Sequence, residues 1–140
     1  MLQQGYFGEV MHFDSAYIHD LRERLLTNEF GARSTDNWQN KYNSSHTGNP
    51  YPTHALGPVC LAMNINRGDR LDYLVSMSTH EKGFSDFIAR NPELKEYSLK
   101  YSLGDMNTTL IATEKNKTIM LQHDISNPRP YSRIPNTPYS

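Results

Sequence analysis

The chain has 140 residues, with 14 basic and 15 acidic side chains and a formal net charge of −1. This balance argues against a nucleic-acid partner, because proteins that bind nucleic acid usually present a basic face. Cys60 is the only cysteine, which excludes an internal disulfide and fits a reducing compartment. Residues 1–13 show neither a basic start nor a long apolar run, so we expect a cytoplasmic protein.

The first half of the chain predicts a strand, a helix, a long loop and a second strand. Apolar residues lie on both faces of the segment 5–13, which predicts a strand covered on both sides. Residues 14–31 show apolar side chains at helical spacing. The turn-rich segment 32–57 predicts a long polar loop, and the nearly apolar segment 59–65 predicts a central strand.

The second half predicts strands around one short helix. Residues 71–77 alternate between apolar and polar side chains, as in a half-buried strand, and 78–91 predict a helix that ends before a proline. Strict alternation predicts another strand over 97–103. Segments 108–114 and 118–125 predict a hairpin. The predicted register places Ala112 opposite Leu121 and Leu110 opposite His123, because the apolar residues of both strands then share one face.

The predicted order is therefore β-α-(long loop)-β-β-α-β-β-β, an α+β protein with a mostly antiparallel sheet. Ferredoxin-like packing and a cupped half-barrel both fit this order. We expect a single domain over 1–125, with the loop 32–57 inside it. Residues 126–140 are rich in proline and tyrosine, which predicts an extended tail.

The order β-α-β-β-β over residues 71–125 resembles one module of the vicinal-oxygen-chelate family. Such modules pair into a cupped barrel, commonly within dimers. The family's usual first-strand histidine has no counterpart in 71–77, and its final-strand glutamate would fall near Met120. The resemblance therefore implies a binding protein without a metal, and we expect neither a metal nor another cofactor.

Strand residues are the candidate catalytic groups if the chain is an enzyme. His12 and His123 lie on predicted strands among apolar neighbours, and with Glu9 or Glu114 they would transfer protons in a cupped sheet. The alternative interpretation is that each histidine is partly buried and bonded to the backbone. No spacing among the histidines matches a metal-ligand motif.

The loop and the tail carry the candidate binding residues, because rigid aromatic and adaptable polar side chains are typical of recognition segments. In the loop these residues are Trp38, Tyr42, His46, Tyr51 and His54, and in the tail they are Arg129, Tyr131 and Arg133.

The leading hypothesis is a small, cytosolic, non-catalytic binding protein for a protein partner or a small polar ligand. An accessory or inhibitory protein of a virus or mobile element would fit. The alternative is a small-molecule enzyme that uses the strand histidines, and whether the chain is an enzyme stays open. Single-stranded nucleic-acid binding comes third, since it normally needs a positive groove. The apolar rows of 71–77 and 97–103 predict a homodimer.

Overall fold

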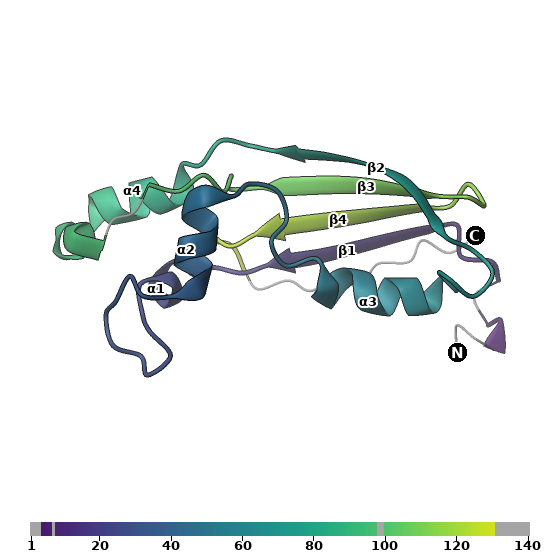
Figure 1. The fold of residues 1–140 in the computed structure, drawn as a ribbon, viewed down its shortest axis with the longest axis horizontal. Coiled ribbons are helices and arrows are strands. Elements are labelled where there is room, and N and C mark those ends of the chain that lie inside the picture. The colour runs from purple at the N-terminus through teal and green to yellow at the C-terminus, as the bar shows by residue number, and fades with distance from the viewer. Residues whose placement is uncertain (1–3, 7, 98–99, 131–140) are drawn as a thin grey trace.

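Four strands form an open, mixed sheet in the order β1-β4-β3-β2 (Figure 1). The structure, a computed structural model, describes residues 4–6, 8–97 and 100–130. Strand β1 (His12–Ile18) pairs in parallel with β4 (Thr118–Asp124). Strand β3 (Asn107–Thr113) is antiparallel to β4 and to the edge strand β2 (Leu71–Ser78).

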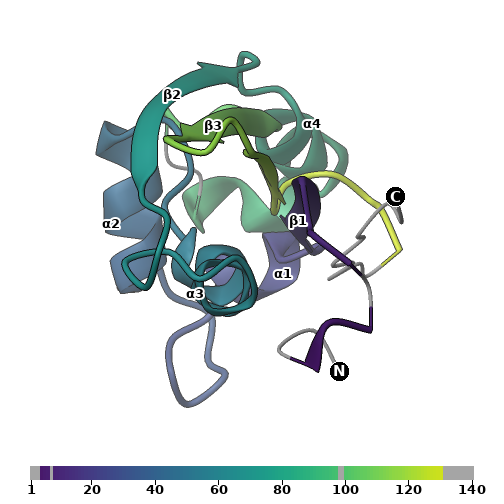
Figure 2. The same cartoon turned by 90° about the vertical axis from the view of Figure 1, so that its right-hand side faces the viewer.

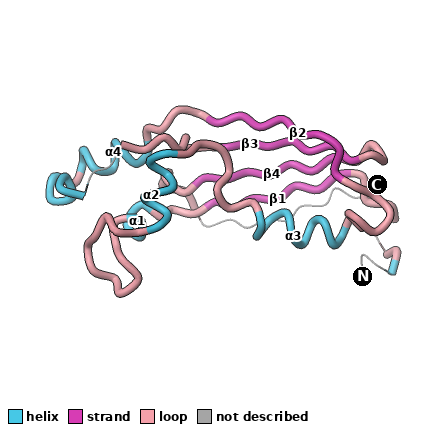
Figure 3. The backbone as a smooth tube through the Cα atoms, in the orientation of Figure 1, coloured by secondary structure: helices cyan, strands magenta, loops and turns pink. Residues whose placement is uncertain are grey.

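The helices lie along one side of the sheet and beyond one of its ends (Figure 3). Helix α1 spans Arg22–Leu25, α2 spans Trp38–Ser45, α3 spans Thr53–Ala62 and α4 spans Gly83–Arg90. A 3₁₀ helix over Pro92–Tyr97 follows α4. Figure 2 looks along the strands and shows α3 lying against one side of the sheet.

Helix α3 covers the sheet through an apolar stripe. Ala55 and Val59 are four residues apart, so they lie on the same side of the helix, and both are buried. They pack with Met63 onto the inward-facing residues of the strands, which include Phe13, Ile111, Ile119 and Leu121. Burial of each large side chain stabilises the fold by about 1.5–3 kcal/mol. This packing fixes the start of α3 above β1 and β4.

A second core lies beyond the end of the sheet and joins α1, α4 and the segment 101–103. Phe84 of α4 is buried there and stacks on Tyr101 at 4.2 Å between ring centroids. Asn40 of α2 is also buried, and it donates a hydrogen bond to the Leu25 carbonyl and accepts one from the Tyr101 hydroxyl. These bonds attach α2 to both neighbours.

We expect Asn40→Ala to lower the free energy of unfolding by about 2 kcal/mol, because the Leu25 carbonyl and the Tyr101 hydroxyl each lose a buried partner. Urea denaturation measures this change. The matched control is Gln39→Ala on the same helix, which should stay within about 0.5 kcal/mol of the original chain. Equal stability of the two variants would contradict this role of Asn40.

The opposite face of the sheet is open. Tyr73, Val75 and Met77 of β2 lie on that face with Leu110 of β3, and all four are more than half exposed. The prediction that residues 71–77 form a strand is confirmed, but the prediction that one of its faces is buried is wrong. The helices cover only the other face of the sheet.

The α+β class is confirmed, whereas several predicted elements are wrong. The observed order is β-α-α-α-β-α-β-β, with a 3₁₀ turn after α4. The segment 14–31, predicted as a helix, contains most of β1 and then only the short α1. The segment 59–65, predicted as a strand, lies mostly in α3, because an apolar run of this length is buried equally well as a helix. The predicted strand 5–13 overlaps β1 only at its end.

The loop, the third strand and the hairpin register also need correction. The predicted loop 32–57 contains α2 and the first residues of α3. The described residues of 97–103 contain no strand. In the hairpin, Ala112 lies opposite Thr118 and Leu110 opposite Met120, because polar side chains take buried positions on β3. These buried positions are Asn107 and Thr109, which bond to each other and to side chains of β2.

Candidate active site

Aromatic and imidazole rings meet where β1 and β4 end and α3 begins. Tyr17 lies at the centre of this ring cluster, which we define as Tyr17, Tyr51, His54 and His123. The Tyr17 ring lies 5.8 Å from the ring of His123 in a stacked arrangement and 5.0 Å from Tyr51 in an edge arrangement. Its centroid lies 6.1 Å from that of His54.

The strands position two members of the ring cluster. Tyr17 and His123 are register partners on the parallel pair β1–β4, and alternation puts both on the face that α3 covers. The side chain of His19, two residues after Tyr17, lies 4.7 Å from the Tyr17 ring. His123 is only 2% exposed. Burial lowers its pKa to about 4, although the adjacent Asp124 carboxylate acts in the opposite direction.

The start of α3 positions the other two members. Tyr51 and His54 are three residues apart around the first turn, and their rings stack at 4.5 Å. Pro52 forms the N-cap between them, and its carbonyl accepts the first helical hydrogen bond, at 2.8 Å from the Leu56 amide. Tyr51 is half-buried, whereas His54 is exposed to solvent.

Small hollows adjoin the ring cluster. One, of about 110 Å³, lies between Tyr17, His54 and Pro58. A narrower one is bounded by Tyr51 and His123 together with Trp38, Gln39 and Asn43 of α2. Asn43 is 2% exposed, and its Nδ2 has no hydrogen-bond partner within the described part of the chain. A buried amide donor without a partner loses free energy unless a water or a ligand accepts its hydrogen bond.

The arrangement is suited to proton transfer at a substrate. An exposed imidazole beside a phenol supplies a general acid and a general base at one point. His123 below them stays neutral near pH 7, so it adds no charge to the ring cluster. Side chains of α2 close the site on one side, and solvent reaches it past His54.

The structure does not bring the predicted catalytic residues together. His123 belongs to the ring cluster, but alternation along β1 puts His12 on the open face of the sheet, where its ring bonds to Asp14 at 2.6 Å and to Thr118 at 2.7 Å. Glu9 pairs with Lys117 at 3.2 Å, and Glu114 pairs with Arg70.

The predicted binding residues are divided among separate places. Tyr51 and His54 belong to the ring cluster, and Trp38 lies beside it. Tyr42 and His46 stack on each other at 4.1 Å further along α2. Arg129 forms an ion pair with the buried Asp124 at 3.2 Å, while Tyr131 and Arg133 lie outside the described residues.

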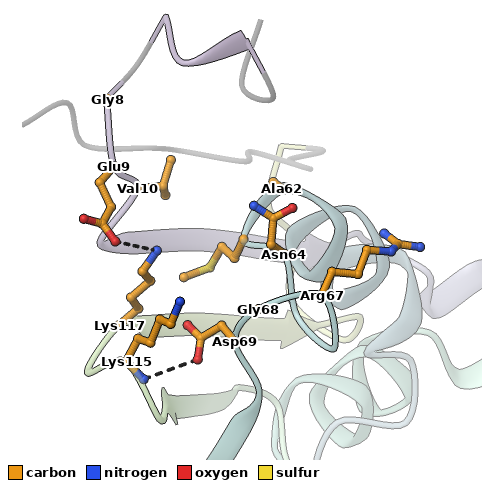
Figure 4. A pocket seen from close by; sticks show the side chains of 11 residues that line it. Gly8, Glu9, Val10, Ala62, Asn64, Arg67, Gly68, Asp69, Lys115 and Lys117 are labelled. Atoms are coloured by element: carbon orange, nitrogen blue, oxygen red, sulfur yellow. Dashed lines mark hydrogen bonds and ion pairs between the residues drawn. The ribbon is translucent and has the colours of Figure 1, made fainter.

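A polar hollow of about 280 Å³ lies at the other end of the sheet, between residues 8–10, the end of α3 and the β3–β4 turn (Figure 4). Its carboxylates already have partners: Glu9 pairs with Lys117, and Asp69 accepts a hydrogen bond from the Lys115 amide at 3.3 Å. Burial alone would raise the pKa of Asp69, but hydrogen bonds, first from the Thr113 hydroxyl, hold it below its usual range. We therefore infer that the side chains around this hollow stabilise the hairpin turn.

In the described ranges, no helix is long and apolar enough to cross a membrane. The same ranges hold no group of three or more histidine, cysteine, aspartate and glutamate side chains that is placed to bind a metal ion.

Comparison with known proteins identifies the domain. The sequence profile of the family described as "Glycosyl hydrolase 109, C-terminal domain" matches residues 1–137. The chain belongs to this family. The match covers the predicted domain 1–125 and most of the predicted tail.

Relatives of this glycosyl hydrolase 109 C-terminal domain are about three times as long. An alpha-N-acetylgalactosaminidase of Bacteroides fragilis is 51% identical over 139 residues, which are 96% of this chain and 32% of that protein. A glycosyl hydrolase family 109 protein of Phocaeicola vulgatus is 50% identical over 95% of this chain and 33% of its own length. The chain therefore spans about a third of the relatives it matches.

Solved structures share the fold. An inositol dehydrogenase homolog of Azotobacter vinelandii, complexed with NAD+, matches 98% of this chain and 30% of its own, with a TM-score of 0.52 and 13% identity. A second structure of that homolog, with NADH and myo-inositol, gives a TM-score of 0.51 and 14% identity. At this identity the similarity concerns the fold alone.

The family assignment corrects the functional hypothesis. The prediction of a non-catalytic binding protein is wrong, and so is an accessory or inhibitory role in a virus or mobile element, because the family consists of domains of glycosyl hydrolases. The assignment also replaces the resemblance to the vicinal-oxygen-chelate family, since residues 71–125 contain three strands where that module needs four.

Sequence reasoning missed Tyr17, His19 and Asn43. Tyr17 and His19 were expected on a helix, where they would not share a face, whereas their spacing of two residues matches a strand. Asn43 was one of many polar residues in the predicted loop. The three-residue spacing of Asn40 and Asn43 was the available signal for a helix there, and the structure shows both side chains buried.

Proposed function

We propose that this domain supplies the substrate-facing acid and base side chains of an α-N-acetylgalactosaminidase. The observation that carries the proposal is the stacked Tyr51–His54 pair, which reaches solvent at the start of α3 above Tyr17 and His123. The Bacteroides fragilis relative, which is 51% identical, supports the choice of substrate.

Hydrolysis of a glycosidic bond needs a proton for the leaving oxygen and a group that activates the attacking species. Most glycosidases use a pair of carboxylic acids for these tasks, and NAD-dependent families are among the exceptions. The side chains around both hollows of the ring cluster include no aspartate or glutamate. In this domain, His54 and Tyr51 are therefore the groups that exchange protons with the substrate.

A nicotinamide cofactor does not fit the residues of this domain. The fold neighbour from Azotobacter vinelandii holds NAD+, and such cofactors rest their pyrophosphate on a glycine-rich turn between a strand and a helix. The sequence contains no G-x-G-x-x-G pattern.

A domain exchange tests the proposal. This chain would replace the corresponding third of the Bacteroides fragilis enzyme, and hydrolysis of 4-nitrophenyl N-acetyl-α-galactosaminide would be measured. We expect the chimera to hydrolyse this substrate. It should not hydrolyse 4-nitrophenyl α-galactoside, which lacks the acetamido group. A chimera that folds, as shown by a cooperative thermal transition, but hydrolyses neither substrate would contradict the proposal.

We also infer a symmetric dimer through the open face of the sheet. Tyr73, Val75, Met77 and Leu110 form an exposed apolar row, and contiguous apolar surface of this kind marks an interface. A second copy is the occupant we propose, since twofold dimers are the commonest oligomers. Light scattering at micromolar concentration should give twice the chain mass, and Val75→Glu should give a monomer. A monomer mass for the original chain would contradict the dimer.

A further inference from the structure

The geometry points to a second sugar-binding site beside the ring cluster, which holds the part of a glycan beyond the sugar that is cleaved. This inference rests on the proposed function, because it assigns the remaining rings of the same substrate. The site is the hollow between the α1–α2 connection and the start of α2, which we call the outer hollow.

The outer hollow has the size and the side chains of a carbohydrate site. Its volume is about 540 Å³, within the range of roughly 300–1,000 Å³ that is usual for ligand sites. Trp38 and Phe30 on its border are 63% and 86% exposed, although large aromatic side chains are normally buried. Arg24, Glu29 and Gln39 lie beside them, and among the described residues none of their side chains has a hydrogen-bond or ion-pair partner.

This combination matches the surface of a sugar ring. A pyranose has an apolar face of C–H groups and a rim of hydroxyl groups. An exposed indole or phenyl ring covers the apolar face, and nearby charged and amide groups bond to the hydroxyls and fix the orientation. A protein partner would need a larger apolar area than two separate aromatic side chains provide.

The walls of the outer hollow are held in place before any ligand binds. The Asn28 side chain accepts hydrogen bonds from the Phe30 and Ala32 amides, each at 3.0 Å. The Asn37 side chain donates to the Thr27 carbonyl at 3.0 Å and accepts from the Gln39 amide at 2.8 Å, where it caps α2. A preformed site binds its ligand without a further cost of ordering the loop.

The outer hollow shares two bordering side chains with the candidate active site. Trp38 and Gln39 border both the outer hollow and the narrow hollow that Tyr51 and His123 enclose. Asn43, with its unpartnered Nδ2, lies in the same narrow hollow, whose volume of about 10 Å³ has room for at most a water molecule. A glycan that places its terminal, cleaved ring at His54 would therefore place the following rings along Trp38.

Binding measurements on the 140-residue chain test this inference, because Trp38 is its only tryptophan. The ligands are methyl N-acetyl-α-galactosaminide and a trisaccharide that ends in α-linked N-acetylgalactosamine. NMR shifts of the His54 imidazole report the ring cluster, Trp38 fluorescence reports the outer hollow, and calorimetry gives each affinity. We expect both ligands to shift the His54 signals and only the trisaccharide to change the Trp38 fluorescence. The trisaccharide should bind about tenfold more tightly, which corresponds to about 1.4 kcal/mol.

Variants separate the two sites. Trp38→Ala should reduce the affinity for the trisaccharide to that for the methyl glycoside, and Phe30→Ala should reduce it several-fold. Tyr42→Ala, one turn further along α2 and outside both hollows, is the matched control and should bind as the original chain does.

Equal affinity for both ligands, with unchanged Trp38 fluorescence and shifted His54 signals, would overturn the second site and leave the proposed function intact. Shifts of neither His54 nor Trp38 with either ligand would overturn both. An equal fluorescence response to a trisaccharide that ends in galactose would also overturn the inference, because the outer hollow would then bind glycans independently of the ring cluster.

Discussion

His54→Gln should lower kcat/KM of the chimeric enzyme for 4-nitrophenyl N-acetyl-α-galactosaminide by about 10²–10⁴-fold, the usual contribution of a general acid or base. Glutamine keeps the size and polarity of the side chain but does not exchange a proton near neutral pH. Tyr51→Phe should cause a loss of at least about tenfold, because it removes the hydroxyl and retains the ring that stacks on His54 at 4.5 Å. Steady-state kinetics of the purified variants measures both changes.

The same domain contains a matched control for this prediction. Tyr42 and His46 also form a stacked pair, at 4.1 Å, and they border neither hollow of the ring cluster. Tyr42→Phe and His46→Gln should therefore leave kcat/KM within about a factor of two, as expected for surface changes away from special features. If His54→Gln and His46→Gln gave equal activity in folded enzyme, the Tyr51–His54 pair would not be the proton-transfer site.

The elements that could be predicted are those whose pattern is local. The strand Leu71–Ser78 follows from apolar side chains at every second position, and the end of α4 follows from Asn91 and the proline after it. The buried side of α4 also has a local pattern, since Phe84 and Ile88 are four residues apart and both are buried.

The elements that could not be predicted depend on distant partners. Residues 14–18 have side chains that suit the start of a helix. They belong to a strand because β1 pairs in parallel with β4, more than 100 residues later in the chain. The register of the β3–β4 hairpin depends on the buried Asn107, whose amide bonds to the Met77 carbonyl and to side chains of β2. No rule that places apolar residues on one face finds such a pairing.

The candidate site was predictable only in part for the same reason. Tyr51, His54 and His123 were candidates because of their side-chain chemistry, but their assembly requires Tyr17, which lies at the centre only when β1 is a strand. Membership of a glycosyl hydrolase family gave no local signal in the sequence. The ring cluster carries no pair of carboxylates, and the chain spans about a third of its relatives.

Acid should destabilise the domain through His123 before its carboxylates titrate. The imidazole is 2% exposed, and its burial lowers the pKa from 6.5 to about 4. Above pH 6.5 the ring is neutral in the folded and the unfolded chain, so its titration has no effect on stability. Below pH 6.5 the unfolded chain binds a proton, whereas the folded chain binds it only near pH 4.

The free energy of unfolding should therefore fall by about 3 kcal/mol between pH 6.5 and 4, at about 1.4 kcal/mol per pH unit. Urea denaturation at half-unit steps of pH measures this slope. His123→Gln should lose the slope over this window, even if it is less stable than the original chain at pH 7. His46→Gln, at an exposed position, should keep it. Equal slopes for His123→Gln and the original chain would mean that the ring of His123 takes up its proton in the folded domain as readily as in the unfolded chain. The conclusion that His123 adds no charge to the ring cluster would then be wrong.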